Sequence, residues 1–306
     1  MAVQSEFWTD YLIDRLYKDN KFLEAAYSDD KYVIGGKRGS VVHINNPGAR
    51  PVIVKNRSSF PATAVQRADN DITYVLDKYT SDPTHITAAD QMEISYPKIE
   101  SVFGDHAGQL VETIGDDMLI KWFTGLPSTS FVNTTGAASA ANNVTGQVGT
   151  RKVMLPYDLK NCQRLMNLAN VPKNDRYALL ESNMLDELTD GLTINAARDF
   201  SEAYDAKTGV VGQLYGFKVM ERSNVAIGVV TTNAVKALGA AVAATDNVMS
   251  LVWQKDCVAK ALGDRRFFES KDDPLYYGDI YSALIRSGGR RRRTDDLGVI
   301  GIVKAP

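Results

Sequence analysis

The first patterned segment of the chain covers residues 3–27. Apolar side chains recur there at roughly helical spacing, as at Phe7, Tyr11 and Leu16, which is typical of a helix with one buried face. Gly35 and Gly36 follow and would close this segment. We therefore expect a helical arm before the first strand.

A polar, extended region comes next. Val41–Ile44 and Pro51–Lys55 have the composition of strands, and Asn45–Gly48 between them is a turn signal. Side chains then alternate through Ile72–Thr80, which predicts another strand. This pattern predicts a protruding hairpin with little core of its own. Such a hairpin is only marginally stable alone, so we expect it to rest on another subunit. One face of the last strand would carry Ile72, Tyr74, Leu76 and Lys78.

The clearest helical pattern runs from Pro97 to Thr124. Pro97 suits the first turn of a helix, and Gly125 with Pro127 suits its end. The helix would be roughly 40 Å long. His106 falls on its apolar stripe, where a packed core histidine is a better interpretation than a metal ligand or a general base. The stripe steps by three or four residues through Ile99, Phe103, His106, Leu110, Ile114 and Met118.

The remaining elements are shorter and do not alternate regularly between strand and helix. Ser128–Gly149 has the composition of a loop. The last two strands, Tyr276–Arg286 and Leu297–Val303, are predicted to flank a turn at Gly288–Gly289. A mixture of this kind predicts an α+β fold. Between these parts we expect helix Pro156–Asn170, strand Arg176–Leu180, helix Met184–Asp190, and strands Phe217–Met220, Ile227–Thr232 and Val248–Trp253.

Charge and composition narrow the class of protein. Of 306 residues, 35 are basic and 37 acidic, giving a formal net charge of -2. The chain therefore lacks the basic excess of proteins that gather nucleic acid by charge alone. Two distant cysteines, Cys162 and Cys257, fit a reducing compartment without a disulfide framework. We expect no signal peptide and no membrane association, because the longest weakly polar stretch, Ala234–Ala244, is too short to span a bilayer.

No motif for catalysis or ligand binding stands out. The phosphate-loop, dinucleotide, HExxH and GxSxG patterns are absent. The three histidines, His43, His85 and His106, are widely separated. Adjacent acids on a helix, such as Asp116 and Asp117, do not face the same way. We therefore expect no enzyme, no metal site and no cofactor, although an enzyme with a site built from scattered residues stays open.

The run Arg290–Arg293 is the sharpest local feature. It could contact nucleic acid, or its arginines could pair with acids of a neighbouring subunit, because Arg suits bidentate contact with carboxylates. Asp295 and Asp296 follow at once, and Asp272–Asp273 precedes the expected hairpin. These acids dilute a polyanion site, so we favour the subunit contact.

Two local stretches and the order of the elements carry a family resemblance. Asn170–Arg176 looks like a segment that recurs in phage coat proteins, and so does Gly209–Val219, with its G-x-x-G-x-x-x-G-[FY]-x-[VI] pattern. The order of arm, polar hairpin, long helix, α/β part and terminal hairpin spans nearly the whole chain. The sequence thus resembles the major capsid (coat) proteins of tailed bacteriophages, which have the Hong Kong 97-type fold.

The resemblance implies a division of the chain and a set of contacts. Residues 1–34 would be the N-arm, 35–80 the E-loop hairpin, 81–155 a P-domain with the spine helix, 156–260 the A-domain with adjoining P-domain elements, and 261–306 a returning P-domain hairpin. Charged residues would fix register between subunits. We expect subunit contacts at Lys37, Arg38, Arg50, Arg57, Arg67, Arg290, Arg291, Arg292, Arg293, Asp272 and Asp273.

The resemblance also implies a function. Identical subunits would form hexamers and pentamers that close into an icosahedral shell around a double-stranded DNA genome, a virion capsid assembled in the host cytoplasm. A separate scaffolding protein, a portal and decoration proteins would be partners, and DNA contact would be weak and non-specific. We expect no cleaved N-terminal domain and no covalent crosslinking. An encapsulin-like compartment shell or another phage structural protein is the alternative.

Overall fold

The long helix is present as α2 (Lys98–Phe123) in a computed structural model that describes residues 18–32, 41–48, 50–87, 98–140 and 147–306. Its buried face steps through Leu110, Ile114 and Met118, as the apolar pattern predicts. Gly125 ends the helix region with a positive φ of 75°, a conformation that glycine adopts without steric cost. The predicted start at Pro97 lies outside the described residues.

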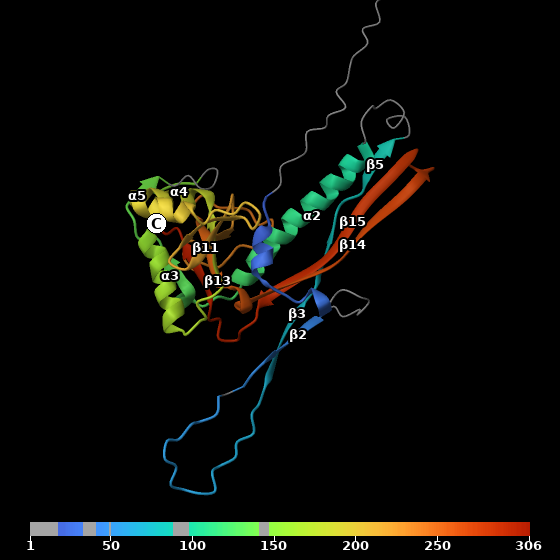
Figure 1. Cartoon of the computed structure of the whole chain (residues 1–306). Coiled ribbons are helices and arrows are strands. Elements are labelled where there is room, and N and C mark those ends of the chain that lie inside the picture. Colours follow the sequence, from blue (N-terminus) through green and yellow to red (C-terminus); the bar gives the residue numbers. More distant parts are fainter. Residues whose placement is uncertain (1–17, 33–40, 49, 88–97, 141–146) are drawn as a thin grey trace, which may run out of the picture.

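The helix α2 runs beside a long antiparallel hairpin (Figure 1). This hairpin consists of β14 (Val258–Asp273) and β15 (Gly278–Arg291). Three short strands complete a five-stranded sheet: β4 (Asp77–Thr80) and β5 (Thr84–Thr87) pair with β15, and β1 (Tyr27–Ser28) pairs with β14. One face of the sheet packs on α2, where Leu110 and Ile114 meet Ala283 and Ile285.

The expected hairpin around Gly288–Gly289 is wrong. Both glycines lie inside β15, and β16 (Val299–Val303) belongs to a different sheet. A Cβ at Gly289 would overlap Met118 Sδ and lie 2.6 Å from the Ala259 carbonyl oxygen. The residue is therefore small because α2 and β14 approach the strand closely, and not because the chain turns.

The other sheet has seven strands in the order β10–β11–β9–β13–β16–β6, with β12 also paired to β13. Its central strand β13 (Asn247–Gln254) is buried along its whole length. Such continuous burial requires cover on both faces. The other strands are β6 (Phe131–Asn133), β9 (Arg176–Glu181), β10 (Val210–Leu214), β11 (Phe217–Arg222) and β12 (Ala226–Gly228).

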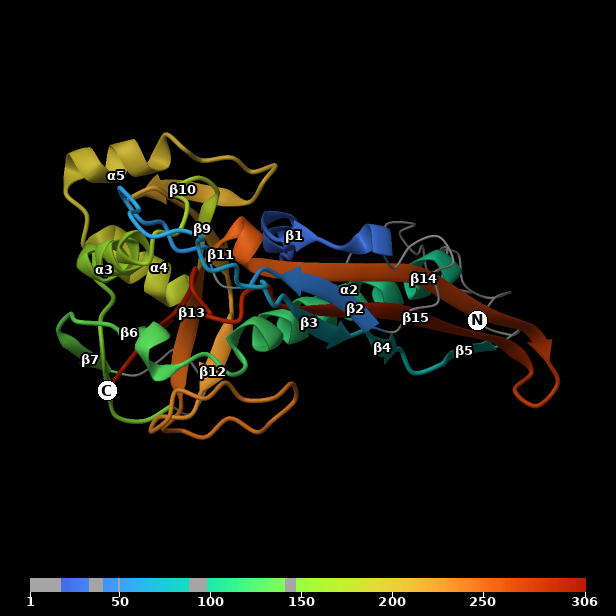
Figure 2. The ribbon, with the colours of Figure 1, turned by 90° about the horizontal axis from the view of Figure 1, so that it is seen from below.

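Two apolar clusters sandwich the seven-stranded sheet. On one face, Leu251 and Trp253 of β13 join Trp122 of α2. On the other, Val248 and Val252 pack under α3 (Pro156–Leu168), α4 (Ser182–Asp190) and α5 (Ile194–Ser201). Figure 2 shows these three helices at the end of the molecule away from the tip of β14–β15. Burying one large apolar side chain contributes roughly 1.5–3 kcal/mol, so these faces are the main stabilising contacts of the body.

Several sequence expectations need correction. A helix was expected over residues 3–27, of which 1–17 lie outside the described residues. The remainder forms a 3-10 helix (Lys21–Ala25) and then β1, because the chain becomes extended to pair with β14. The supposed loop Ser128–Gly149 contains 3-10 residues 128–130, β6 and β7 (Ala138–Ala140), which pairs with β8 (Thr150–Lys152). The strand predicted at Ile227–Thr232 stops at Gly228. Pro51–Lys55 forms no strand. Neither β10 nor α5 was predicted, and two further 3-10 turns cover Asp30–Tyr32 and Lys255–Cys257.

None of the helices among the described residues is long and apolar enough to cross a membrane.

The packing around Gly289 makes a first prediction. Gly289→Ala should lower the free energy of unfolding by about 1–3 kcal/mol, because the added methyl is forced against the Ala259 backbone. Gly104→Ala is the matched control: it lies in α2 with nothing within 4 Å of its Cβ position, and should raise stability by about 0.5–1 kcal/mol. Thermal unfolding of the unassembled chain measures both. Equal effects of the two substitutions would contradict the packing role of Gly289.

Candidate assembly surface

The protruding hairpin has a packed base. Its strands β2 (Val41–Asn46) and β3 (Asn70–Val75) are antiparallel, with Ile44 directly opposite Ile72. Inward side chains of both strands contact Ala259 and Ala261 of β14. The alternation predicted one face with Ile72, Tyr74, Leu76 and Lys78. The first three are buried, as predicted, whereas Lys78 is exposed. The base therefore belongs to its own subunit's core.

The loop between these strands has no such support. Its described residues, 47–48 and 50–69, contain no strand and lie mostly in solvent, and Figure 1 shows the loop projecting away from the body. Five large apolar side chains are nevertheless exposed there: Ile53 is 92% accessible, Val52, Phe60 and Val65 are 78–86% accessible, and Val54 is 50% accessible. Such a concentration of apolar surface on a thin projection marks a contact with another molecule.

A small polar clasp holds the neck of the loop. The Gly48 N–H donates to Asp69 Oδ1 at 2.8 Å, and Arg67 Nε donates to the same oxygen at 2.5 Å. The Gly48 hydrogen bond, followed by the Arg67 contact, lowers the pKa of Asp69 below its usual value. The ionised carboxylate therefore joins the outgoing and returning arms of the loop.

The charged residues predicted on this hairpin have different environments. Lys37 and Arg38 lie outside the described residues. Arg50 and Arg57 are exposed or nearly so, and Arg67 pairs with Asp69 of its own chain. None of these observations tests a contact with a second subunit, which stays a prediction.

The arginine run lies at the end of β15, and most of it is bound within the chain. Arg291 pairs with Asp296 at 2.6 Å and donates to the Trp122 carbonyl at 3.0 Å. Arg293 pairs with Asp295 at 2.5 Å. These contacts fix the chain between β15 and β16, whereas an intersubunit role for the run stays a prediction.

The two remaining members of the run, Arg290 and Arg292, contact backbone carbonyls and a ring. Arg292 stacks over the Tyr27 ring at 3.8 Å and donates to the Asp256 carbonyl. Arg290 is exposed and donates to the Thr73 carbonyl of β3 at 2.9 Å. At the other end of the hairpin, Asp273 accepts from the Leu275 N–H at 2.9 Å and so shapes the β14–β15 turn; the side chain of Asp272 is outside the description.

The sequence reasoning missed the exposed apolar residues. The run Val52–Val54 carried a signal, because three β-branched residues beside Pro51 were interpreted as a strand. The structure gives that run no strand partner. A second exposed apolar group, Leu275 and Tyr277, caps the tip of β14–β15.

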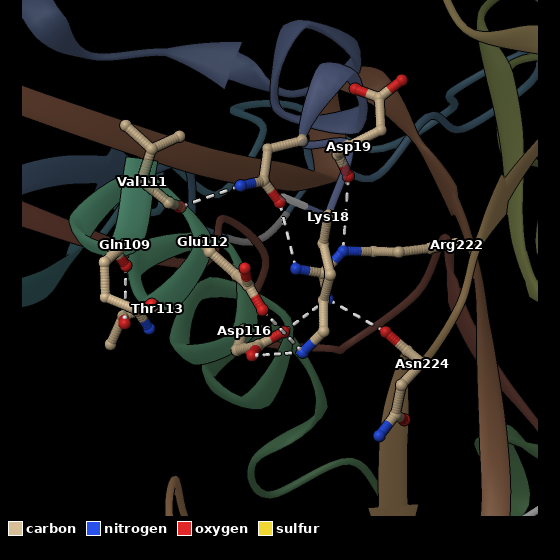
Figure 3. Close-up of polar contacts among 10 residues, drawn as sticks. Lys18, Asp19, Gln109, Val111, Glu112, Thr113, Asp116, Arg222 and Asn224 are labelled. Atoms are coloured by element: carbon tan, nitrogen blue, oxygen red, sulfur yellow. Dashed lines mark hydrogen bonds and ion pairs between the residues drawn. The ribbon is translucent and has the colours of Figure 1, made fainter. Parts of the chain in front are cut away.

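A buried ion-pair network fixes the point where the N-terminal segment meets the body (Figure 3). Arg222 of β11, whose side chain is fully buried, pairs with Asp116 of α2 at 2.5 Å. Lys18 reaches Asp116 at 3.0 Å and Glu112 at 3.3 Å. Asn20 accepts from Arg222 and donates to the Val111 carbonyl at 2.8 Å. One cluster thus ties α2, β11 and the incoming chain together.

The following residues continue this tie across both sheets. The Trp253 indole donates to the Ala25 carbonyl at 2.9 Å, and Asp30 accepts from the Leu262 N–H at 2.7 Å. Tyr74 of the protruding hairpin donates to Asp29 at 3.0 Å. Burial, and then the charge of Asp29, raise the pKa of Tyr74 far above its ordinary value, so its hydroxyl stays a donor. We call residues 18–32 the belt.

The described side chains offer little for catalysis. They contain no group of three His, Cys, Asp or Glu residues that could hold a metal ion. Burial raises the pKa of the Cys257 thiol to about 11 and that of Cys162 further, so neither is a thiolate nucleophile near neutral pH. His106 is buried on α2, as expected of a core residue.

Comparison with known proteins identifies the architecture. No protein-family model matches the sequence, and no curated protein matches it. The capsid structure of the cyanophage P-SCSP1u superposes with a TM-score of 0.66 at 16% identity, covering 99% of this chain and 93% of that one. A chain of Mycobacterium phage Che8 gives 0.64 at 16% identity, with 98% and 97% covered. The capsid of cyanophage Pam1 gives 0.66 at 9% identity, with 99% and 96% covered.

The chain has the phage capsid fold. The match spans nearly the whole chain, so the α+β class and the resemblance to phage capsid structures expected from the sequence are confirmed. At 9–16% identity the likeness is one of fold. It assigns no role to individual residues of this chain.

The buried ion pair in this capsid fold makes a second prediction. Asp116→Asn leaves the Arg222 guanidinium buried without its counter-charge and should cost about 3 kcal/mol of unfolding free energy. Asp199→Asn removes a partner from an exposed pair with Arg198 and should cost less than about 1 kcal/mol. Denaturant unfolding of the two variants measures the difference. A cost for Asp116→Asn as small as that of the control would mean that Arg222 needs no counter-charge.

The clasp at the loop neck makes a pH prediction. The folded-state pKa of Asp69 lies below its unfolded value, near 4. Its contribution is therefore complete above about pH 4 and is lost as the pH falls through the folded-state pKa. Protection of the Gly48 amide from hydrogen exchange, corrected for intrinsic rates, should be lower at about pH 3 than at about pH 6. Asp69→Asn should abolish this dependence, while Asp71→Asn should keep it; unchanged protection in Asp69→Asn would refute the clasp.

Proposed function

We propose that this chain is the major capsid protein of a tailed bacteriophage, which self-assembles into the icosahedral shell around a double-stranded DNA genome. The whole-chain match to phage capsid structures is the observation that carries the proposal. The function is structural and not enzymatic, and the protein resides in the virion capsid after assembly in the host cytoplasm.

The exposed loop supports this proposal independently of the fold. Its base packs on β14, while its tip presents Ile53, Val52 and Phe60 to solvent. An isolated subunit would keep this apolar surface in water, whereas a neighbouring copy can cover it. Many such contacts add up through closed symmetry, so each can be weak.

The proposal assigns parts of the chain to roles. Residues 1–34 serve as N-arm, 35–80 as E-loop, 81–155 as P-domain with α2 as the spine helix, 156–260 as A-domain with adjoining P-domain elements, and 261–306 as the returning P-domain part. Copies form hexamers and pentamers. A separate scaffolding protein, a portal and decoration proteins are further partners, and contact with packaged DNA is weak.

Electron microscopy of the purified chain, alone and with its scaffolding protein, tests the proposal. Closed shells that fill with DNA in infected cells are the expected result. Shells loaded with protein cargo would favour an encapsulin-like compartment. A dispersed monomer under all conditions would overturn assembly altogether.

The apolar loop makes a fourth prediction. Ile53→Asp should leave thermal unfolding of the free subunit unchanged, because the side chain makes little contact with its own body. It should reduce the fraction of chain in shells by at least about tenfold, since a charge would be buried at the contact. Ser59→Asp places the same charge at another exposed position of the loop and should assemble nearly as wild type. Sedimentation separates shells from free chain; normal assembly of Ile53→Asp would remove the loop tip from the interface.

A further inference from the structure

The face of the five-stranded sheet opposite α2 carries an unfavourable arrangement of charge. Arg286 of β15 lies directly opposite Lys78 of β4. The neighbouring Asp77 and Tyr79 point the other way, toward Lys121 of α2. Lys78 and Arg286 therefore stand side by side on the face turned away from α2, beyond the part that the β2–β3 hairpin covers. Like charges directly opposite one another destabilise a sheet.

Two more cations extend this pair into a stripe. Arg266 of β14 lies opposite Leu284, two residues from Arg286, so it shares the same face. Arg290, four residues further along β15, also shares it and is exposed. We call Lys78, Arg266, Arg286 and Arg290 the basic stripe.

None of the residues that the structure describes supplies a counter-charge to the basic stripe. None of its four side chains forms an ion pair with a described residue. Among these residues, its one side-chain hydrogen bond runs from Arg290 to the Thr73 carbonyl. Buried cations elsewhere in the described chain are neutralised or hydrogen-bonded: Arg222 and Lys304 form ion pairs, and Arg176 donates to carbonyl and amide oxygens. An anionic partner from outside the subunit would relieve the repulsion within the stripe.

The surroundings of the stripe favour a protein partner over phosphate. Phe268 is opposite Ser282 on the same face and is half exposed. Beyond it, His85 and Tyr276 form a ring contact with centroids 5.7 Å apart. A partner that carries apolar side chains together with acids would match both the cations and these rings.

The chain itself contains one segment of this chemistry. Residues 1–14 have no Lys or Arg and carry three acids, Glu6, Asp10 and Asp14. A spacing of four residues places all three on one face if the segment is helical, as its apolar pattern predicts. Five large apolar side chains accompany them: Phe7, Trp8, Tyr11, Leu12 and Ile13. We call residues 1–14 the acidic segment.

We propose that the acidic segment of one copy docks on the basic stripe of a second copy. This inference rests on the proposed function, because it names one contact by which subunits join. The described chain begins at Lys18, which is held by Glu112 and Asp116 of α2, whereas the stripe is on the sheet face turned away from α2. With residues 1–14 helical and residues 15–17 extended, the seventeen preceding residues span about 30 Å, enough to reach an adjoining copy.

A charge exchange in the full-length chain tests the proposal. The stripe variant K78E/R286E places acids opposite the acidic segment, and the segment variant E6K/D10K/D14K places bases opposite the stripe. Each alone should lower the fraction of chain in shells by at least about tenfold, because like charges then meet at the contact. Combining both sets of changes in one chain should restore shells to within about twofold of wild type, since the basic segment of every copy then meets the acidic stripe of any neighbour, in hexamers and in pentamers alike.

Controls separate this contact from other effects. K160E/R164E makes the same charge change on the exposed outer side of α3 and should assemble as wild type. Thermal unfolding of each free variant checks that the subunit is intact. Failure of the combined variant to assemble, or normal assembly of either single set alone, would overturn the proposal.

Two further outcomes locate the error if the proposal is wrong. If the segment variant assembles normally while the stripe variant forms shells that retain less DNA, the stripe binds nucleic acid instead. If wild-type chain forms shells and the exchange has no effect, this contact is wrong but the capsid function stands. If wild-type chain never assembles, both fail.

Discussion

Trp122 is the side chain on which the arrangement of the two sheets depends. Its indole N–H donates to the Ala259 carbonyl of β14 at 3.1 Å, which binds α2 to the five-stranded sheet. Its ring lies 5.6 Å from that of Trp253 in the seven-stranded sheet and 5.9 Å from that of Phe22 in the belt. Aromatic contacts of this kind add to the large apolar area that each ring buries. One residue therefore fixes the positions of α2, both sheets and the belt relative to one another. The position of the protruding hairpin is fixed as well, because its base packs on β14.

Local periodicity explains which elements the sequence could predict. The helix α2 and the strands β9 and β13 were placed within one or two residues, because their apolar patterns repeat over several turns or are continuous. The partner of each strand was harder to predict from the sequence, because pairing in a sheet joins residues that are far apart in the chain. Gly288–Gly289 shows the difficulty: a glycine pair signals a turn locally, but the close approach of Met118 and Ala259 is a property of the folded state.

The protruding hairpin was predicted in outline and not in chemistry. A thin polar projection was expected from alternating and turn-forming residues, and the structure has one. The emphasis on charge was incomplete, because Arg291 and Arg293 find acids two to five residues away in their own chain. The apolar tip became recognisable only once Val52–Val54 was seen to lack a partner strand. Conversely, the unpaired Lys78 and Arg286 are ordinary surface residues in the sequence, and only the β4–β15 register places them together.

The proposed assembly gives the bare loop at residues 50–69 a further consequence for a subunit that has not yet met its neighbours. An extended backbone without strand partners is the form that proteases bind and cut. A newly made subunit is therefore vulnerable at this site for as long as it stays alone, and incorporation would remove the vulnerability by occupying the same backbone. When assembly is slow or stalls, proteases would therefore degrade the leftover subunits. No separate signal that marks them as surplus would be needed.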